Sequence, residues 1–178
     1  MGSVQDKNIA WYLPRPKPDH YKGGMPLYAE EWLMELARRL LNKNDYSKIL
    51  NVFCGMNKYG IRVDLNPEVK PDYLGDIHKL SEFLPMDKYD IIFADPPYSN
   101  EETEKLYSKE YPKLNYRKWT GECTKYLADG GLLIVYHKQI PANPNPEVYS
   151  VVKRVFIGNR IWHLPRVAIF FQKRIDVE

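Results

Sequence analysis

The chain of 178 residues carries a formal net charge of +3, with 44% hydrophobic and 28% charged residues, which is typical of one globular domain with its own core. No apolar run is long enough to cross a membrane, and the N-terminal residues lack the apolar segment of a signal peptide. Two cysteines are too few for a disulfide framework or a structural zinc site, and the four histidines show no metal-ligand spacing. We therefore predict a soluble cytoplasmic protein without a metal.

Taken in chain order, strands alternate with helices. Residues 1–26 are rich in Pro and Gly and predict an irregular arm, whereas apolar residues from Leu33 to Leu41 recur at the helical period and predict a helix over 27–43. Further helices are expected at 78–84 and 101–128. Short apolar runs bounded by Gly, Asn or Pro predict strands at 48–55, 61–66, 72–76, 89–95 and 130–140, and the tail holds two more strand-like runs. This order predicts an α/β protein with a mostly parallel sheet and an antiparallel C-terminal edge strand, in which residues 27–178 form a single domain.

Acidic side chains follow several of the predicted strands. Asp64 ends the second strand, Asp76 ends the third and Asp95 ends the fourth, while the first strand ends in Cys54 and Gly55. Ligands of open α/β sheets bind at the carboxyl ends of the strands. One Asp at such a place is most often a helix cap or a turn former, but three at one edge indicate a site.

Two motifs at these strand ends resemble those of a known family. The sequence NVFCG (51–55) resembles the Gly-rich turn of class I S-adenosylmethionine-dependent methyltransferases. The sequence DPPY (95–98) resembles the catalytic motif of those members that methylate exocyclic amines of nucleic-acid bases. The resemblance covers roughly residues 45–140. It implies a Rossmann-like sheet, S-adenosylmethionine as cofactor, and methyl transfer to adenine or cytosine in DNA ahead of a base in RNA.

The same resemblance implies roles for individual residues in binding the cofactor. Asp64 matches the acid that binds the ribose hydroxyls, and Asp76 matches the acid that accepts from the adenine amino group. Ile77 is then an apolar neighbour of the adenine ring. The turn under the methionine part of the cofactor consists of Phe53, Cys54 and Gly55.

The DPPY residues suit the chemistry of an aromatic exocyclic amine. Such an amine is a poor nucleophile because its lone pair is delocalised into the ring, and acceptors beside its two hydrogens favour the tetrahedral geometry needed for attack. The Asp95 carboxylate is one acceptor, and the carbonyl of Pro96, in a turn fixed by Pro96 and Pro97, is the other. Tyr98 offers a flat face on which a base rotated out of a helix can stack. Cys54 needs no chemical role, because this reaction requires no cysteine nucleophile.

The chain departs from the family at the first crossover. The usual turn is of the F-x-G-x-G kind and opens a long helix, whereas Asn57 stands at the second glycine here and only residues 54–59 or so separate the first two strands. Parallel neighbours normally need a dozen or more connecting residues. Six or seven extended residues reach roughly 20 Å, enough to return along a strand of roughly 17 Å. We therefore predict that the first crossover helix is short or missing, and that the helix at 27–43 or a partner chain covers that flank of the sheet.

The predicted single domain includes no separate segment that reads the target sequence. Target reading then falls to residues 99–128, to the basic tail, or to a partner, either a second copy in a homodimer or a separate specificity protein. The tail could follow phosphates, and the arm 1–26 interleaves basic and aromatic residues, but a solvated edge hairpin and a structural strap explain both segments equally well. Alternatives to the DNA enzyme are an RNA base methyltransferase, a methyltransferase of protein or small-molecule amines or amides, and a non-catalytic cofactor-binding subunit.

Overall fold

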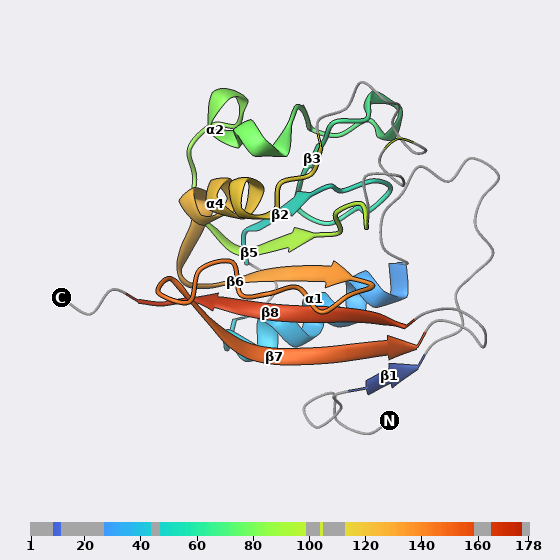
Figure 1. The fold of residues 1–178 in the computed structure, drawn as a ribbon, viewed down its shortest axis with the longest axis vertical. Coiled ribbons are helices and arrows are strands. Elements are labelled where there is room, and N and C mark those ends of the chain that lie inside the picture. The colour runs from blue at the N-terminus through green and yellow to red at the C-terminus, as the bar shows by residue number, and fades with distance from the viewer. Residues whose placement is uncertain are drawn as a thin grey trace.

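The computed structural model describes residues 9–11, 27–43, 47–98, 104, 113–158 and 165–175 (Figure 1). Most of the predicted arm 1–26 and the first part of the predicted helix 101–128 lie outside these ranges. None of the helices in the described ranges is long and apolar enough to span a membrane. In the same part of the chain, no three His, Cys, Asp or Glu side chains are grouped so that they could hold a metal ion.

The described strands form one eight-stranded sheet in the order β1-β7-β8-β6-β5-β2-β3-β4. Its strands are β1 (Ile9–Trp11), β2 (Ile49–Val52), β3 (Ile61–Asp64), β4 (Tyr73–Leu74), β5 (Tyr89–Ala94), β6 (Leu127–His137), β7 (Tyr149–Gly158) and β8 (Arg166–Lys173). The central strands from β6 to β4 pair in parallel, whereas β8 pairs antiparallel with both β6 and β7. Figure 1 shows β6 and β8 pointing in opposite directions. The predicted mostly parallel sheet with antiparallel C-terminal strands is thereby confirmed.

The outer edge on the C-terminal side differs from the prediction. β8 lies inside the sheet, between β6 and β7, and β1 pairs in parallel with β7 from Ile9↔Phe156 to Trp11↔Gly158. The predicted arm is therefore not irregular throughout, and the edge strand is parallel to its neighbour. An open edge of β7 would expose a row of unpaired backbone groups, and three residues of the arm pair with part of that row.

Helices cover both faces of the sheet. They are α1 (Leu27–Leu40), α2 (Leu80–Phe83) and α4 (Tyr116–Tyr126), with 3₁₀ turns η2 (Pro67–Val69) and η3 (Ile77–Lys79). α1, which lies behind β7 and β8 in Figure 1, packs Leu33 and Ala37 into the same buried cluster as Phe93 of β5. α2 and α4 pack Leu80 and Trp119 into the cluster on the opposite face. The helix predicted at 27–43 is confirmed, and it covers the flank for which the sequence left a partner chain as the alternative.

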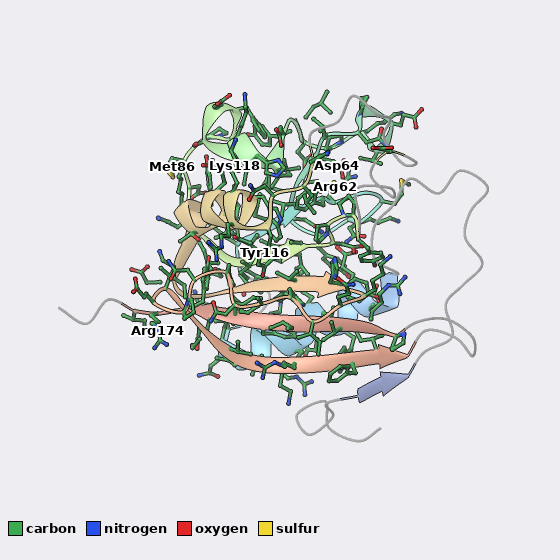
Figure 2. The ribbon with its side chains drawn as sticks, viewed as in Figure 1. Arg62, Asp64, Met86, Tyr116, Lys118 and Arg174 are labelled. Carbon is green, nitrogen blue, oxygen red and sulfur yellow. The ribbon has the colours of Figure 1, made fainter. Side chains whose placement is uncertain are left out.

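The connection between β2 and β3 contains no helix, as the sequence predicts: all residues from 53 to 60 are described, and none is helical. Arg62 of β3 holds this segment in place. Its guanidinium donates to the carbonyls of Gly55 (3.1 Å), Val69 (2.9 Å) and Lys70 (3.0 Å). Figure 2 labels Arg62 beside Asp64 on this strand. One long side chain thus joins the turn after β2 to η2, where a crossover helix would otherwise pack.

Glu30 of α1 is a buried carboxyl that contacts β2 and the helix-free connection. Its residue is fully buried, and its Oε1 accepts from Asn51 Nδ2 at 3.0 Å. Burial raises the pKa of Glu30 from 4.5 to about 7, against the opposing effect of the N–H groups of Tyr59 and Lys58. Between about pH 4.5 and pH 7 the folded protein therefore holds a proton that the unfolded chain has already lost.

This buried carboxyl predicts a pH dependence of stability. The stabilisation is fully present below the unfolded pKa of 4.5 and is lost as the pH rises through the folded value of about 7. We expect the Glu30→Gln variant, which cannot titrate, to lack a decline of about 3 kcal/mol in the free energy of unfolding over this range. Urea denaturation of both proteins at about pH 5 and about pH 8 measures it. An equal decline in both proteins would contradict the buried, protonated state of Glu30.

Candidate functional site

The carboxyl ends of β2 and β5 lie at the topological switch point of the sheet, where the strand order reverses direction. β3 and β4 are added on one side of β2, whereas β5 and β6 are added on the other. Val52 pairs with Ala94, so the residues that follow them, Phe53 and Asp95, leave the sheet side by side. Ligands of open α/β sheets bind in the crevice at such a switch point. The predicted cofactor turn and the predicted catalytic motif therefore meet at one place.

The turn after β2 has a backbone that L-residues seldom adopt. Phe53 has φ +54° and Gly55 has φ +49°. The Cys54 N–H donates to the Val63 carbonyl at 3.1 Å, and the Gly55 N–H donates to Asp64 Oδ2 at 2.8 Å, so the turn is attached to β3. Burial, with the charge of Asp64 nearby, raises the pKa of the Cys54 thiol to about 12. Cys54 therefore stays a protonated thiol, which fits a packing role.

Asp64 stands at the end of β3, and both of its carboxylate oxygens already accept hydrogen bonds. Oδ2 accepts from Gly55, and Oδ1 accepts from the Asn66 N–H at 2.9 Å, in a residue that is only 2% exposed. Burial raises the pKa of Asp64, and the N–H groups of Asn66 and Gly55 oppose that effect. Asp64 thus holds the turn at Phe53–Gly55 against β3, and only its remaining lone pairs can accept from a further donor.

Asp76 caps η3 at the carboxyl end of β4 and keeps one oxygen for a ligand. Its Oδ1 accepts from the backbone N–H of His78 at 2.9 Å and lies 2.7 Å from Nδ1 of the same residue. Its Oδ2 accepts no hydrogen bond from the part of the chain that the structure describes, and 24% of the side chain is exposed. Ile77 beside it is 2% exposed and belongs to the core cluster. Asp76 therefore offers an acceptor at this edge, while Ile77 supports it from the core.

Asn57 gives the clearest sign that the turn is built for a polar group. It is 3% exposed, yet neither its Oδ1 nor its Nδ2 has a hydrogen-bond partner among the described residues. An unpaired buried amide costs about 1–3 kcal/mol, so such a group normally has a partner. Asn57 stands where the resembling family has its second glycine, two residues beyond Gly55 at the end of the strained turn. The arrangement therefore fits a polar ligand in this turn.

The DPPY residues follow β5, and Tyr98 lies between a carboxylate and a guanidinium group. Its hydroxyl donates to Asp95 Oδ1 at 3.4 Å and accepts from Arg166 Nε at 2.9 Å. Two cations lie over its ring, with the Arg166 Cζ atom 4.7 Å and the Lys138 Nζ atom 5.2 Å from the ring centre. The His137 ring meets it edge-on at 5.0 Å. The Tyr98 ring is therefore held in one orientation from several sides.

A hollow of about 320 Å³ opens beside this motif. Its lining includes Pro96, Pro97 and Tyr98 of the motif, together with Tyr116 and residues 139–142. The Tyr116 hydroxyl donates to the Ala142 carbonyl at 2.7 Å and so joins two segments of this lining. The hollow lies next to Asp95 and is lined mainly by apolar and aromatic side chains, as is usual for a ligand site.

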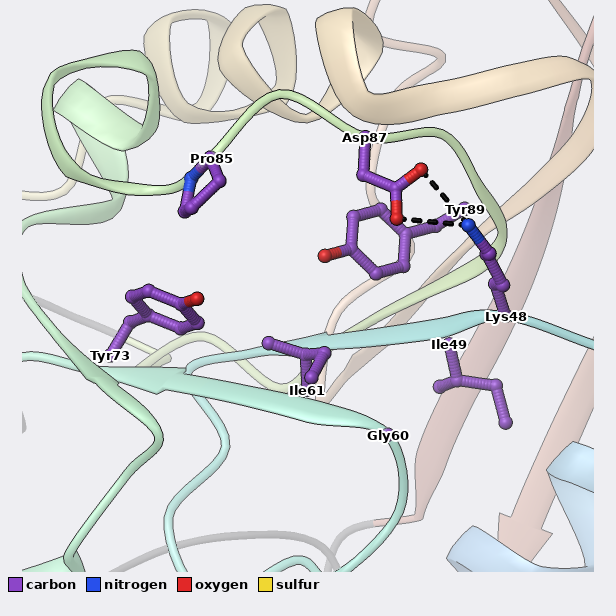
Figure 3. A pocket seen from close by; sticks show the side chains of 8 residues that line it. All are labelled: Lys48, Ile49, Gly60, Ile61, Tyr73, Pro85, Asp87 and Tyr89. Atoms are coloured by element: carbon purple, nitrogen blue, oxygen red, sulfur yellow. Dashed lines mark hydrogen bonds and ion pairs between the residues drawn. The ribbon is translucent and has the colours of Figure 1, made fainter.

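A second hollow, of about 470 Å³, lies at the opposite edge of the sheet (Figure 3). Its walls come from the starts of β2 to β5, with Tyr73 and Tyr89 facing each other across it and Pro85 above. An ion pair between Lys48 Nζ and Asp87 Oδ2, 3.0 Å long, closes one end. None of the predicted site residues lies there, and the amino ends of parallel strands are not where such sheets bind their ligands.

Comparisons with known proteins bear on this arrangement. No protein-family model matches the chain. Over 115 residues it is 30% identical to the type II methyltransferase M.BamHI of Bacillus amyloliquefaciens, a match that covers 58% of this chain and 25% of that protein. The chain thus spans about a quarter of the length of this relative.

Solved structures share the arrangement of the sheet. TrmN from Thermus thermophilus superposes with a TM-score of 0.55 at 16% identity, over 80% of this chain and 48% of that one. The N-methyltransferase NodS from Bradyrhizobium japonicum WM9 superposes with a TM-score of 0.54 at 15% identity, over 83% of this chain and 97% of that one. NodS is also solved in complex with S-adenosyl-l-homocysteine. The chain has the class I methyltransferase fold.

This class I methyltransferase fold brings two residues to the site that the sequence did not assign to it. Arg166 was predicted only as part of a basic tail, and it reaches Tyr98 across a separation of 68 residues because β8 inserts beside β6. His78 was given no chemistry, and it contacts Asp76. Its position two residues after a strand-terminal acid was the one signal in the sequence. For Arg166 the sequence held none, because its contact depends on the pairing of β8.

Proposed function

We propose that this chain is an S-adenosylmethionine-dependent methyltransferase that acts on an exocyclic amino group of a nucleic-acid base, adenine or cytosine in DNA before a base in RNA. The observation that carries the proposal is the position of Asp95. It leaves the sheet beside the turn at Phe53, and the three residues that follow it, Pro96 to Tyr98, line the hollow. The class I fold and the match with a type II methyltransferase support the same reaction.

The residues at the carboxyl edge fit the proposed cofactor. The unpaired amide of Asn57 suits the polar end of the methionine part, and the Asp76 carboxylate suits an amino group. Asp64 has lone pairs for hydroxyls beside the turn it holds, and Ile77 supplies apolar surface. When bound, S-adenosylmethionine supplies a methyl group that is already activated on a sulfonium.

The chain then has to place the target amine in line with that methyl group, because the donor needs little further activation. Asp95 accepts from one hydrogen of the amine and the Pro96 carbonyl accepts from the other, so the nitrogen lone pair is freed for attack. Arg166 donates to the Tyr98 hydroxyl and so holds the ring beside the hollow. A base that enters the hollow meets the Tyr98 ring in a fixed orientation.

Positive charge around the hollow supports a polyanionic substrate. Lys138 and Arg166 both lie over the Tyr98 ring, and the whole chain carries a net charge of +3. Basic side chains beside a hollow for a base can pair with the phosphates that flank it.

Transfer of a radiolabelled methyl group from S-adenosylmethionine tests the proposed substrate class. The purified chain is incubated in parallel with duplex DNA, single-stranded DNA, structured RNA and a protein extract, and each fraction is counted. We expect label in nucleic acid and above all in DNA. Label confined to the protein fraction or to small molecules would mean that the proposed nucleic-acid substrate is wrong. Binding of the cofactor without methyl transfer to any fraction would favour a non-catalytic subunit.

The two acids of the cofactor edge give a separate prediction. We expect Asp64→Ala and Asp76→Ala each to weaken S-adenosylmethionine binding about tenfold, because each loses an acceptor worth about 1–3 kcal/mol in a partly closed site. Asp64→Ala should also lower the melting temperature, since it releases the turn at Gly55. Calorimetric titration measures the affinities, and Asp87→Ala at the opposite edge is the matched control. An unchanged dissociation constant would remove the substituted acid from the cofactor site.

A further inference from the structure

His78 lies between the two halves of the proposed site and contacts both. The residue is 7% exposed, and its Nδ1 lies 2.7 Å from Asp76 Oδ1. Its Nε2 accepts from the backbone N–H of Asn115 at 2.9 Å. A backbone N–H can only donate, so Nε2 carries no proton in this arrangement. The ring is then neutral with its proton on Nδ1, and that proton is donated to Asp76.

On one side, the imidazole fixes the acid of the cofactor edge. Asp76 Oδ1 receives both the backbone N–H and the ring N–H of His78. Two donors on one oxygen hold the carboxylate plane, so that Oδ2 is the oxygen left to accept from a ligand. In metal sites, groups that orient a ligating side chain in this way change the affinity by about tenfold or more.

On the other side, the imidazole fixes the start of α4. Asn115 is the N-cap of this helix, and its side chain accepts from the Lys118 N–H at 3.0 Å. Its neighbours in the sequence, Leu114 and Tyr116, both line the hollow beside the DPPY motif. The position of Asn115 therefore affects where Leu114 and Tyr116 lie in the lining of the hollow.

We propose that His78 is a positioning residue that couples the two halves of the site, holding Asp76 for an amino group of the cofactor and Asn115 for the wall of the target hollow. The coupling rests on the proposed function. A ligand that stabilises Asp76 in its hydrogen-bonded orientation also stabilises the imidazole and, through it, the first turn of α4. Because such linkage is reciprocal, cofactor and target then favour each other's binding.

Two substitutions separate the two contacts of the ring. The amide nitrogen of Asn takes the place of Nδ1, so His78→Asn keeps the bond to Asp76 and loses the one to Asn115. The amide oxygen of Gln takes the place of Nε2, so His78→Gln keeps the bond to Asn115 and loses the one to Asp76. Lys79→Ala is the control, because this neighbour in η3 has a half-exposed side chain and only a 3.7 Å ion pair with Glu82.

The probe is S-adenosylhomocysteine, and the two readouts are calorimetric affinity and the amide NMR signals of Asn115 and Tyr116. In the wild type and in Lys79→Ala we expect binding to shift both signals. In His78→Asn the affinity should stay within about threefold while the shifts vanish. In His78→Gln the affinity should fall about tenfold, and the signals should still shift once the site is saturated.

The opposite pattern would overturn the coupling role. His78→Asn with the full signal shifts, His78→Gln with wild-type affinity, or equal losses in both variants would each leave His78 as a packing residue. Asp76→Ala separates this inference from the proposed function. If Asp76→Ala weakens binding and the His78 variants do not, the positioning role alone is wrong. If Asp76→Ala binds S-adenosylhomocysteine like the wild type, the assignment of Asp76 to the cofactor is wrong.

Discussion

Asp95→Ala is expected to lower the rate of methyl transfer about a hundredfold or more, while the affinity for S-adenosylmethionine stays within a few-fold. Asp95 leaves the sheet beside the turn at Phe53 and not in it, and the three residues after it line the hollow in which the target amine is proposed to bind. Removing one strong hydrogen-bond acceptor from a group that develops charge in the transition state typically has an effect of that size. Single-turnover transfer of labelled methyl and calorimetric titration measure the two quantities on the same preparation.

Two further variants and a control show whether the loss of methyl transfer is due to the missing Asp95 carboxylate. Asp95 also accepts from Tyr98, so Tyr98→Phe removes that hydroxyl while leaving the carboxylate in place. Asp95→Asn keeps an acceptor oxygen without the charge and should be intermediate in rate. Asp87→Ala, at the opposite edge of the sheet, should transfer like the wild type. Full activity of Asp95→Ala would contradict the mechanism, because Asp95 is the acid that the switch point places beside the turn at Phe53.

Gly60→Ala is expected to destabilise the protein by about 3 kcal/mol or more, the largest effect on stability among the substitutions considered. Gly60 has φ +73°, and a methyl group there would lie 2.4 Å from the Ile49 carbonyl oxygen and 2.7 Å from its side chain. The clash is with backbone at the start of β2, which is paired on both sides and cannot move away. The helix-free connection thus depends on a glycine at its last residue.

Gly121→Ala is the matched control for this prediction. Gly121 lies in α4, and nothing stands within 4 Å of the place where its methyl group would be. The same change of residue should therefore stabilise the protein by up to about 1 kcal/mol, because alanine favours a helix over glycine. Urea denaturation of both variants gives the free energies of unfolding. Equal stabilities of the two variants would contradict the close approach of Gly60 to Ile49.

Much of the sheet could be predicted because its strands are short apolar runs with clear ends. The runs that became β2, β3 and β5 have clear ends, and the few residues between the first two runs predicted a first crossover helix that is short or missing. The boundary between α4 and β6 was placed too late, since the helix ends at Tyr126 and the strand begins at Leu127. Pattern gives no warning of a helix that turns into a strand within one residue.

Features that depend on tertiary pairing could not be predicted from the sequence. β1 is three residues long and is a strand only because β7 offers it an edge. Arg166 reaches Tyr98 because β8 inserts between β6 and β7, an order that no local signal gives. Asp64 was placed correctly at the end of β3, but its bond to the Gly55 N–H appears only when the turn after β2 is seen to return to it. These contacts join segments far apart in the chain.

The identity of the methylated nucleoside tests the central claim most directly. DNA and RNA that have received labelled methyl from S-adenosylmethionine are digested to nucleosides, separated and identified by mass spectrometry, with Asp95→Ala as the blank. An exocyclic amine as acceptor predicts N6-methyladenine or N4-methylcytosine, absent from the blank. Label on a ring carbon, as in 5-methylcytosine, would contradict the account, because attack from carbon needs a cysteine nucleophile and Cys54 is a buried, protonated thiol.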